Sequence, residues 1–311
     1  MERFRLMAAP MQGFTDAAFR HFHAEIFSAG MDNITYCAPF MRIDKGEGRR
    51  RDLRDITSPL NENHELLAQV ICRDAEEFRL LCRVMTGAGL RRIDLNMGCP
   101  FRPQVLHGRG AALLANPEGL GEIAEAMKEM PEVSFSVKMR LGIDDAGEWR
   151  RAMPIINGMP LSHITLHPRT VSQQYSGELH LEQAERLMAA TQTPVIFNGG
   201  ISSPADIEEL RNRFPGIAGV MTGQGLLRRP SLLAEWSAGE EWPEEKRRAG
   251  TLRLHEALLE HYRTTLCGEA QIMSKIKPFW DWFGEGLEHK ARKAIRKAHT
   301  LRALDEAIAN I

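Results

Sequence analysis

The stretch PVIFNGGISSPAD, residues 194–206, contains one complete strand–turn–helix unit. It begins with a short apolar segment that ends at Asn198 in a glycine pair, which is typical of a buried strand followed by a tight turn. Ser203 and Pro204 then indicate a helix start, because a capping side chain precedes a proline in the first turn. This unit predicts a parallel strand followed directly by a helix.

Segments of the same kind recur along the first three-quarters of the chain. The eight expected strands are Phe4–Ala9, Asn33–Cys37, Leu67–Cys72, Arg92–Asn96, Ser134–Arg140, His163–His167, Pro194–Asn198 and Ala218–Thr222. The clearest expected helices are Asp16–Ser28, Ala75–Thr86, Pro117–Met130, Leu181–Ala190 and Pro204–Arg213. Eight such units predict a (β/α)₈ TIM barrel. A doubly wound sheet is the alternative, but no G-x-G-x-x-G follows the first strand. Residues 42–60 are charged and irregular, which predicts a long loop.

The composition changes after the eighth segment. An acidic, turn-rich linker covers residues 238–245, and the remaining chain carries apolar residues at helical spacing. The expected helices there are Thr251–Leu266, Gln271–Phe283 and Glu288–Asn310, making three or four in all. We therefore predict a barrel domain over residues 1–238 and a small all-helical domain over residues 246–311.

The charge balance limits the possible partners. Lys and Arg number 40 against 41 Asp and Glu, for a net charge of −1, so only a local patch can support nucleic-acid binding. One basic run lies in the helical region, with no acidic residue between positions 290 and 303. It contains Lys290, Arg292, Lys293, Arg296, Lys297 and Arg302. This run indicates either a phosphate-binding surface or a solvated helix face. The nearby aromatic residues 279, 280, 282 and 283 are either core or base-stacking residues.

Other classes of protein are disfavoured. No apolar run approaches the roughly 18 residues of a membrane helix, and the apolar N-terminal run is too short for a signal peptide. The cysteines are scattered and contain no CxxC pair, which argues against a disulfide framework or zinc site; no metal is expected. They are Cys37, Cys72, Cys82, Cys99 and Cys267. We expect a reducing, cytoplasmic location with mostly buried thiols.

Polar and glycine residues end nearly every expected strand, and barrel enzymes carry their chemistry at these ends. The last two strands end in Asn198-Gly199-Gly200 and Thr222-Gly223-Gln224-Gly225, whose backbone N–H groups suit a phosphate. Lys138 lies on a buried strand, where an unpaired ammonium is costly. The pattern therefore predicts a phosphorylated cofactor such as FMN, with Lys138, Gln69 and Asn198 at the polar edge of its ring.

Two further strand-end residues are candidates for chemistry. Cys99 lies between Gly98 and Pro100 after the fourth strand, where its thiol can be a nucleophile or a general acid. The alternative for a lone cysteine is a small buried apolar residue. His167 precedes Arg169 at the end of the sixth strand, which favours a cofactor or substrate contact over a purely structural histidine.

The strand ends contain motifs that occur in a fixed order between residues 6 and 226. The motifs are Ala9-Pro10-Met11-x-Gly13-x-Thr15-Asp16, Asp94-Leu95-Asn96-x-Gly98-Cys99-Pro100, Gly108-x-Gly110-Ala111-Ala112-Leu113-Leu114, Val137-Lys138-x-Arg140-Leu141-Gly142, His167-x-Arg169-Thr170 and Asn198-Gly199-Gly200-Ile201. Together they resemble the signature of the bacterial tRNA-dihydrouridine synthases. The helical C-terminal region is similar to the RNA-binding domain of that family. The chain length and short N-terminus favour the type that acts on uridine 16.

The resemblance implies a function for each part of the chain. It implies an FMN-binding TIM barrel that reduces the C5–C6 double bond of a uridine in tRNA, with NADPH as reductant, in a monomer. It implies flavin contacts from Pro10, Met11, Gln12, Gln69, Lys138 and His167, with Asn198, Gly199, Gly200, Gly223 and Gln224 at the phosphate end. Cys99 is then the proton donor. The implied substrate contacts are Asn96, Arg140, Arg169, Lys290, Lys293, Arg296 and Lys297.

The chain departs from the family pattern at several positions. Gln224 stands where the family commonly has an arginine, so the cation near the phosphate is either replaced elsewhere or lost. On the third expected strand the family usually has Gln-Leu-x-Gly, and only the glutamine, Gln69, is present in this chain. Pro168 follows His167 at a position where the family usually has glycine. The lysine usual after the cysteine is absent, with Arg102 as a possible substitute. One alternative function is an FMN-dependent barrel oxidoreductase acting on a free pyrimidine, as dihydroorotate dehydrogenases do. Another is an RNA-binding protein that has lost its flavin.

Overall fold

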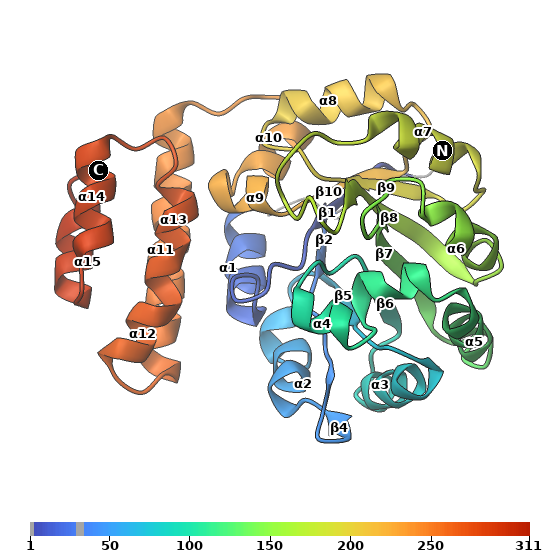
Figure 1. Ribbon diagram of the computed structural model, residues 1–311. Helices are drawn as coiled ribbons and strands as arrows, with labels where there is room; N and C mark the ends of the chain where they lie inside the picture. Colours follow the sequence, from blue (N-terminus) through green and yellow to red (C-terminus); the bar gives the residue numbers. More distant parts are fainter. Residues whose placement is uncertain (1–2, 29–33) are drawn as a thin grey trace.

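A computed structural model describes residues 3–28 and 34–311 (Figure 1). Eight parallel strands close into a barrel in the order β1-β10-β9-β8-β7-β6-β5-β2. The barrel strands are β1 (Arg5–Ala8), β2 (Ile34–Cys37), β5 (Glu65–Val70), β6 (Arg92–Met97), β7 (Ser134–Gly142), β8 (Leu161–Thr170), β9 (Val195–Asn198) and β10 (Gly219–Thr222). The predicted TIM barrel is confirmed. The first residue of the expected second strand, Asn33, lies outside the described residues.

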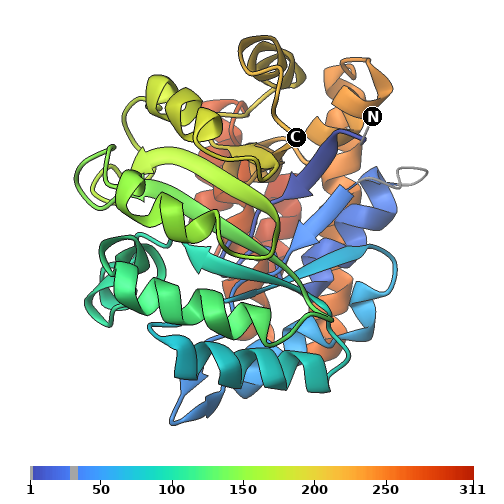
Figure 2. The same ribbon diagram turned by 90° about the vertical axis from the view of Figure 1, so that its right-hand side faces the viewer.

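Helices surround the barrel. They are α1 (Ala17–Phe27), α2 (Arg50–Ile56), α3 (Ala75–Gly87), α4 (Arg102–Leu106), α5 (Pro117–Lys128), α6 (Trp149–Ile156), α7 (Leu181–Ala189), α8 (Pro204–Arg213), α9 (Gln224–Arg228) and α10 (Leu232–Ala238). In Figure 2, the cyan α3 and green α5 pack side by side outside the strands. The predicted start of α8 is confirmed, since Ser203 and Asp206 form a reciprocal capping box.

The strand register brings the predicted site residues to one end of the barrel. Asn96 on β6 is the neighbour of Lys138 on β7, and Arg140 on β7 is the neighbour of His167 on β8. Since all eight strands run parallel, their carboxyl ends meet at the same rim. The chemistry-bearing side chains therefore gather there.

The prediction of a long irregular loop over residues 42–60 is wrong. The segment forms a short antiparallel hairpin of β3 (Ile43–Asp44) and β4 (Glu47–Gly48), then α2, then the 3₁₀ turn η1 (Pro59–Asn61). Its fold depends on the fully buried Arg20 of α1, which donates hydrogen bonds to Asp55 at 3.0 Å and to Asn61 at 2.9 Å. These partners lie far away in sequence, so local patterning gives no sign of them.

The C-terminal region is all-helical, as predicted, but its boundaries differ. It contains α11 (Glu244–Thr265), α12 (Glu269–Ile276), the 3₁₀ turn η3 (Lys277–Phe279), α13 (Trp280–Phe283), α14 (His289–Lys297) and α15 (Leu301–Ile308). The expected single helix over 288–310 is therefore two helices, separated at the extended residue Ala298. Lys277 stabilises this break, because its ammonium donates to the carbonyls of Arg296 and Ala298 at 2.8 and 2.7 Å.

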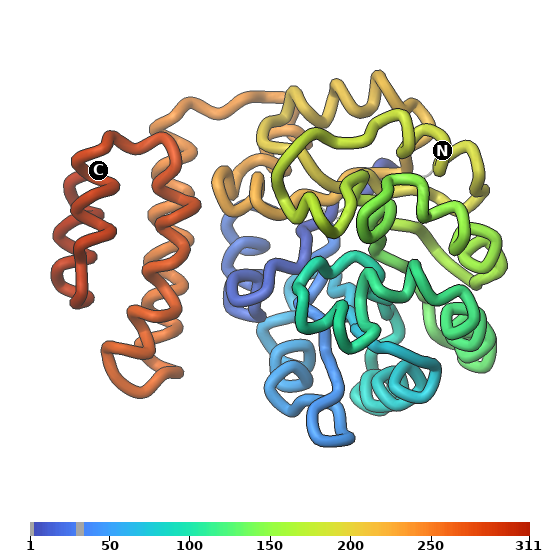
Figure 3. Tube along the Cα trace, in the orientation of Figure 1, coloured from blue at the N-terminus to red at the C-terminus, as the bar shows by residue number. Residues whose placement is uncertain are grey.

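The C-terminal helices pack against the barrel through α1. A short connection after α10 leads into α11, which lies beside α1 (Figures 1 and 3). A second hydrophobic core joins Phe19 of α1 to Leu258 of α11 and to Phe279. Polar contacts support the junction, since Asp16 accepts a hydrogen bond from Lys275 at 2.7 Å.

Apart from Cys99, which belongs to the candidate site, the chain has four cysteines. Three of them, Cys37, Cys72 and Cys82, are buried as expected. Cys267, after α11, is exposed, which corrects that part of the expectation. Within residues 3–28 and 34–311, no helix has the length and apolarity required to cross a membrane.

Candidate active site

Two adjoining cavities open at the carboxyl ends of the barrel strands. One, of about 380 Å³, lies over β9 and β10, and the other, of about 570 Å³, lies over β5, β6 and β7. Both are lined by Pro10, Met11, Lys138, Tyr175 and Gln224. The two cavities therefore adjoin along these five residues. We call the one over β9 and β10 the glycine-side cavity and the one over β5, β6 and β7 the thiol-side cavity.

All the barrel residues that the resemblance assigns to the cofactor, the proton donor or the substrate line this site. The glycine-side cavity is lined by Pro10, Met11, Lys138, His167, Arg169, Asn198, Gly199, Gly200, Gly223 and Gln224. The thiol-side cavity adds Gln12, Gln69, Asn96, Cys99 and Arg140. The four basic residues predicted on the helical region lie apart from both cavities, on α14, where they are exposed.

The loop between β1 and α1 forms a wall common to both cavities, and its motif residues fix its shape. The hydroxyl of Thr15 accepts a hydrogen bond from the backbone N–H of Met11 at 2.8 Å. Gly13 has a φ of +89°, a conformation that a side chain makes unfavourable. Asp16 then caps α1 by accepting from the backbone N–H of Phe19 at 3.2 Å. The loop is thus held rigidly at the site.

A buried chain of hydrogen bonds runs from the barrel interior to the Cys99 loop. Asp94 accepts from Ser136 at 2.6 Å and from the Gln69 amide at 2.7 Å. The Gln69 carbonyl accepts from the Asn96 amide at 2.8 Å. The Asn96 carbonyl in turn accepts from the backbone N–H groups of Gly98 and Cys99, at 3.1 and 2.8 Å. Gln69 and Asn96 therefore orient the loop that carries the thiol, in addition to lining the cavity.

Burial shifts the pKa of the acidic groups in this region upward. It raises the pKa of Asp94 to about 6, while the hydrogen bonds from Ser136 and Gln69 act in the opposite direction. Burial also raises the pKa of the Cys99 thiol above its ordinary value, although Arg140 and Lys138 lie close enough to oppose the shift. Cys99 is therefore protonated at neutral pH and can donate a proton.

Arg140 braces the site from β7. Its guanidinium donates to the carbonyl of Gly98 at 3.0 Å and to the carbonyl of Thr170 at 2.8 Å, and it is almost fully buried. The ring of Tyr175 lies 5.3 Å from the guanidinium carbon. Arg140 thus connects the Cys99 loop to the end of β8, and it also faces the thiol-side cavity.

The side chain of Lys138 faces both cavities. Among the described residues its ammonium makes no hydrogen bond or ion pair, and burial together with the nearby Arg140 lowers its pKa to about 8. A half-buried cation without a partner is costly, and a ligand rich in carbonyl or anionic groups would satisfy it. The glycine-rich turns leave room beside it. The residues that line the two cavities therefore fit a phosphorylated flavin.

The glycines at the end of β9 are required by close packing. Gly199 has a φ of +112°, and a Cβ there would lie 2.7 Å from the His167 ring. His167 is buried, and burial lowers its pKa well below its usual value, so the ring is neutral. Its Nε2 accepts a hydrogen bond from Arg169 at 3.0 Å. Asn198 donates to the carbonyl of Met221 at 2.7 Å, which joins the two strand ends.

Sequence reasoning missed several residues that line the site, among them Tyr175, Arg228 and Trp282. Tyr175 follows β8, Arg228 ends α9, and Trp282 reaches the thiol-side cavity from α13. Arg228 lies four residues after Gln224, which is one helical turn, so its spacing was an available signal. Trp282 comes from the C-terminal helices, and no local pattern links it to the barrel rim.

A TIM barrel with cavities lined by polar residues at the carboxyl ends of its strands has the architecture of a barrel enzyme. The dihydrouridine synthase (Dus) family matches residues 7–309 of the chain. The chain therefore belongs to the dihydrouridine synthase family. It is an oxidoreductase that uses a flavin to reduce uridine to dihydrouridine, which agrees with the resemblance and the predicted reaction class.

Individual relatives support this membership. A probable tRNA-dihydrouridine synthase of Staphylococcus epidermidis is 29% identical over 293 residues, covering 90% of this chain and 84% of its own. One from Rickettsia conorii is 27% identical over 309 residues, covering 98% and 92%. Probable tRNA-dihydrouridine synthase 2 of Bacillus subtilis is 28% identical over 268 residues, covering 82% and 78%.

A solved structure shares the barrel fold. Morphinone reductase superposes with a TM-score of 0.55, covering 78% of this chain and 88% of its own, at 11% sequence identity. At that identity, the likeness concerns the fold alone.

Proposed function

We propose that the protein binds FMN across the two cavities and reduces the C5–C6 double bond of a uridine in tRNA, with NADPH as the reductant. The observation that carries this proposal is the protonated Cys99 thiol in the same site as the unpartnered Lys138. The relatives named as probable tRNA-dihydrouridine synthases support tRNA as the substrate.

The site residues have separate tasks in this reaction. A flavin held by these residues would supply the hydride that adds to C6 of the uracil. Cys99 donates the proton to C5, and its raised pKa keeps it in the protonated form that a general acid requires. Lys138 lies where a cation offsets negative charge that develops on the uracil carbonyl oxygens or the ring of the cofactor. Arg140 and Asn96 hold the thiol loop in place.

The C-terminal helices bind the tRNA backbone in this proposal. The cations of α14 are exposed and form no ion pairs within the described part of the chain, so they are free to contact phosphates. They are Lys290, Arg292, Lys293, Arg296 and Lys297. The target uridine leaves its stack to enter the thiol-side cavity, as base-modifying enzymes require. The barrel over residues 1–238 is then catalytic, and residues 246–311 bind tRNA.

The finer assignments are also proposals. The target is position 16 in the D-loop, and Arg169 contributes to substrate binding from the lining of the glycine-side cavity. The enzyme acts as a monomer in the cytoplasm, where its tRNA substrate and reduced thiols are found.

The test uses tRNA that lacks dihydrouridine, the purified protein, NADPH and mass-spectrometric mapping of the product. We expect dihydrouridine at one position with the wild-type protein and less than about one-hundredth of that rate with Cys99→Ala, because loss of a general acid costs roughly 10²–10⁴-fold. Cys267→Ala is the matched control, since this exposed thiol lies away from the site. An unchanged rate in Cys99→Ala would refute the proton-donor assignment. Turnover of free uridine but not of tRNA would refute tRNA as the substrate.

A further inference from the structure

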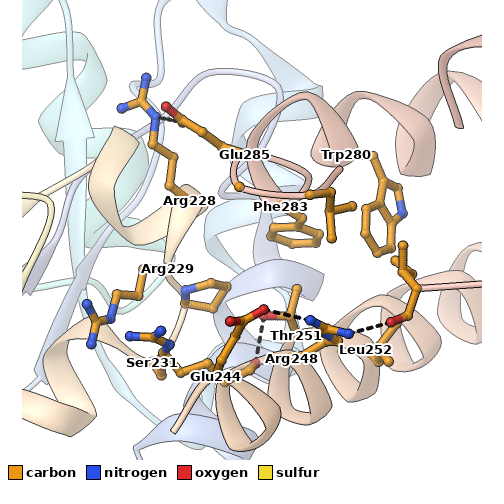
Figure 4. A pocket seen from close by; sticks show the side chains of 15 residues that line it. Arg228, Arg229, Ser231, Glu244, Arg248, Thr251, Leu252, Trp280, Phe283 and Glu285 are labelled. Atoms are coloured by element: carbon orange, nitrogen blue, oxygen red, sulfur yellow. Dashed lines mark hydrogen bonds and ion pairs between the residues drawn. The ribbon is translucent and has the colours of Figure 1, made fainter. Parts of the chain in front are cut away.

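Arg228 lies on the wall between the cofactor site and a third cavity. This third cavity, of about 400 Å³, lies at the junction of the barrel and the C-terminal helices, and we call it the junction cavity (Figure 4). Arg228 lines both the junction cavity and the glycine-side cavity. Its side chain therefore reaches the place where the cofactor phosphate is proposed to bind.

The turn that precedes α9 lacks a cation of its own. Gln224 begins α9 and is neutral, while Gly223 and Gly225 beside it carry no side chain. Arg228 lies one helical turn further on, and its Nη1 donates a hydrogen bond to the side-chain amide oxygen (Oε1) of Gln224 at 3.4 Å. The guanidinium thus extends along α9 toward the turn and places a positive charge next to it.

The same side chain contacts the C-terminal helices. Figure 4 shows the Nε of Arg228 directed at the carboxylate of Glu285, with which it forms an ion pair. The guanidinium carbon also lies 4.9 Å from the centre of the Trp282 ring. The Nη2 group of Arg228 makes no hydrogen bond to any described residue, so it is available to a ligand.

The other arginines of the junction cavity are already engaged elsewhere. Arg229 pairs with Glu235 and Glu241, and Arg247 also pairs with Glu241. Arg248 pairs with Glu244 at 2.6 Å. None of these three lines the glycine-side cavity. Arg228 is therefore the arginine of this group that faces the cofactor site.

We infer that Arg228 binds the phosphate of FMN, in place of a cation at position 224, and connects that phosphate to the C-terminal helices through Glu285 and Trp282. The inference rests on the proposed flavin function. A guanidinium suits this task because it can bind a phosphate with Nη2 while Nε stays paired with Glu285.

The test measures the dissociation constants of FMN and of riboflavin, which lacks the phosphate, by quenching of flavin fluorescence on the full-length apoprotein. We expect Arg228→Ala to weaken FMN binding roughly ten- to one-hundred-fold, the range for a lost hydrogen bond to a charged group, with riboflavin binding unchanged. Adding Gln224→Arg to Arg228→Ala is expected to restore most of the FMN affinity. Arg247→Ala, a matched arginine of the junction cavity, is expected to leave FMN binding unchanged.

The variant Glu285→Gln tests separately whether FMN binding needs the ion pair between Arg228 and the C-terminal helices. It removes the ion pair but keeps the guanidinium, so FMN binding is expected to persist. Three results would overturn the inference: unchanged FMN affinity in Arg228→Ala, equal weakening of FMN and riboflavin, or an equal loss in Glu285→Gln. If the wild-type protein binds neither flavin, the proposed function fails together with this inference. If the wild-type protein binds FMN and one of the three results above is found, only the inference about Arg228 fails.

Discussion

Replacement of Asn96 by alanine tests whether the hydrogen-bond chain from Asp94 holds the Cys99 loop. The Asn96 side chain is buried and makes three hydrogen bonds, to the N–H groups of Gly98 and Cys99 and to the carbonyl of Gln69. Alanine removes all three and leaves their partners without a bond. If Asn96 only faced the substrate, its loss would leave the loop unchanged.

The structure sets the size of the effect. At about 1 kcal/mol for each hydrogen bond, Asn96→Ala lowers the free energy of unfolding by about 3 kcal/mol. The two bonds to the loop account for about 2 kcal/mol, which corresponds to a roughly thirty-fold larger population of the open loop. Asn157→Ala is the control, because this exposed asparagine makes a single side-chain hydrogen bond, to Ala190. Its expected loss is no more than about 1 kcal/mol.

Two assays measure the outcome. Urea unfolding gives the change in stability, and alkylation of Cys99 at fixed pH reports opening of the loop. The alkylation uses a Cys267→Ser background, because Cys267 is exposed while Cys37, Cys72 and Cys82 are buried. We expect faster alkylation in Asn96→Ala by up to about thirty-fold. A stability loss no larger than that of the control, with an unchanged alkylation rate, would refute the reasoning.

Three other predictions concern charge and stacking. Because the pKa of Lys138 is about 8, its side chain loses its positive charge as the pH rises through 8, and activity that needs this charge falls. The fall in rate near pH 8 should therefore be absent from the pH–rate profile of Lys138→Met. Replacing Lys293 and Lys297 by glutamine removes two proposed phosphate contacts. In a plot of the logarithm of the tRNA binding constant against the logarithm of the salt concentration, the slope should become shallower by between about one and two. An unchanged slope would exclude α14 as a phosphate contact. Phe101 is exposed and lines the thiol-side cavity, so Phe101→Ala is expected to weaken tRNA binding by about 1–3 kcal/mol in a filter-binding assay. The control is Leu106→Ala, which is expected to have no such effect because Leu106 is exposed at the end of α4 and does not line the cavity.

The barrel could be predicted from sequence because its determinants are local. A parallel strand that is buried on both faces is a short apolar run, and the residue that ends it is polar or glycine. Asn198 and Ser203 mark such boundaries, and both keep these roles in the structure. The candidate site followed from the same logic, since residues at parallel strand ends meet at one rim.

The parts that could not be predicted depend on long-range contacts. Residues 42–60 fold around Arg20, which reaches them from α1. The break between α14 and α15 depends on Lys277, about twenty residues earlier in the chain. In the site, Trp282 reaches the barrel rim because the C-terminal helices pack on α1. No spacing or periodicity within a segment encodes such contacts.

Asp16 belongs at once to the cofactor wall and to the domain junction. It caps α1 at the end of the loop that borders both cavities, and it also binds Lys275 and lies within hydrogen-bond distance of the Tyr262 hydroxyl. The two halves of the enzyme are therefore not interchangeable modules. A chimera that takes its C-terminal helices from another family member must also take a matching segment 11–16, or the grafted helices lose these polar contacts to the barrel. If the C-terminal helices bind tRNA as proposed, the angle at which the RNA meets the cofactor site is inherited together with the barrel's first loop.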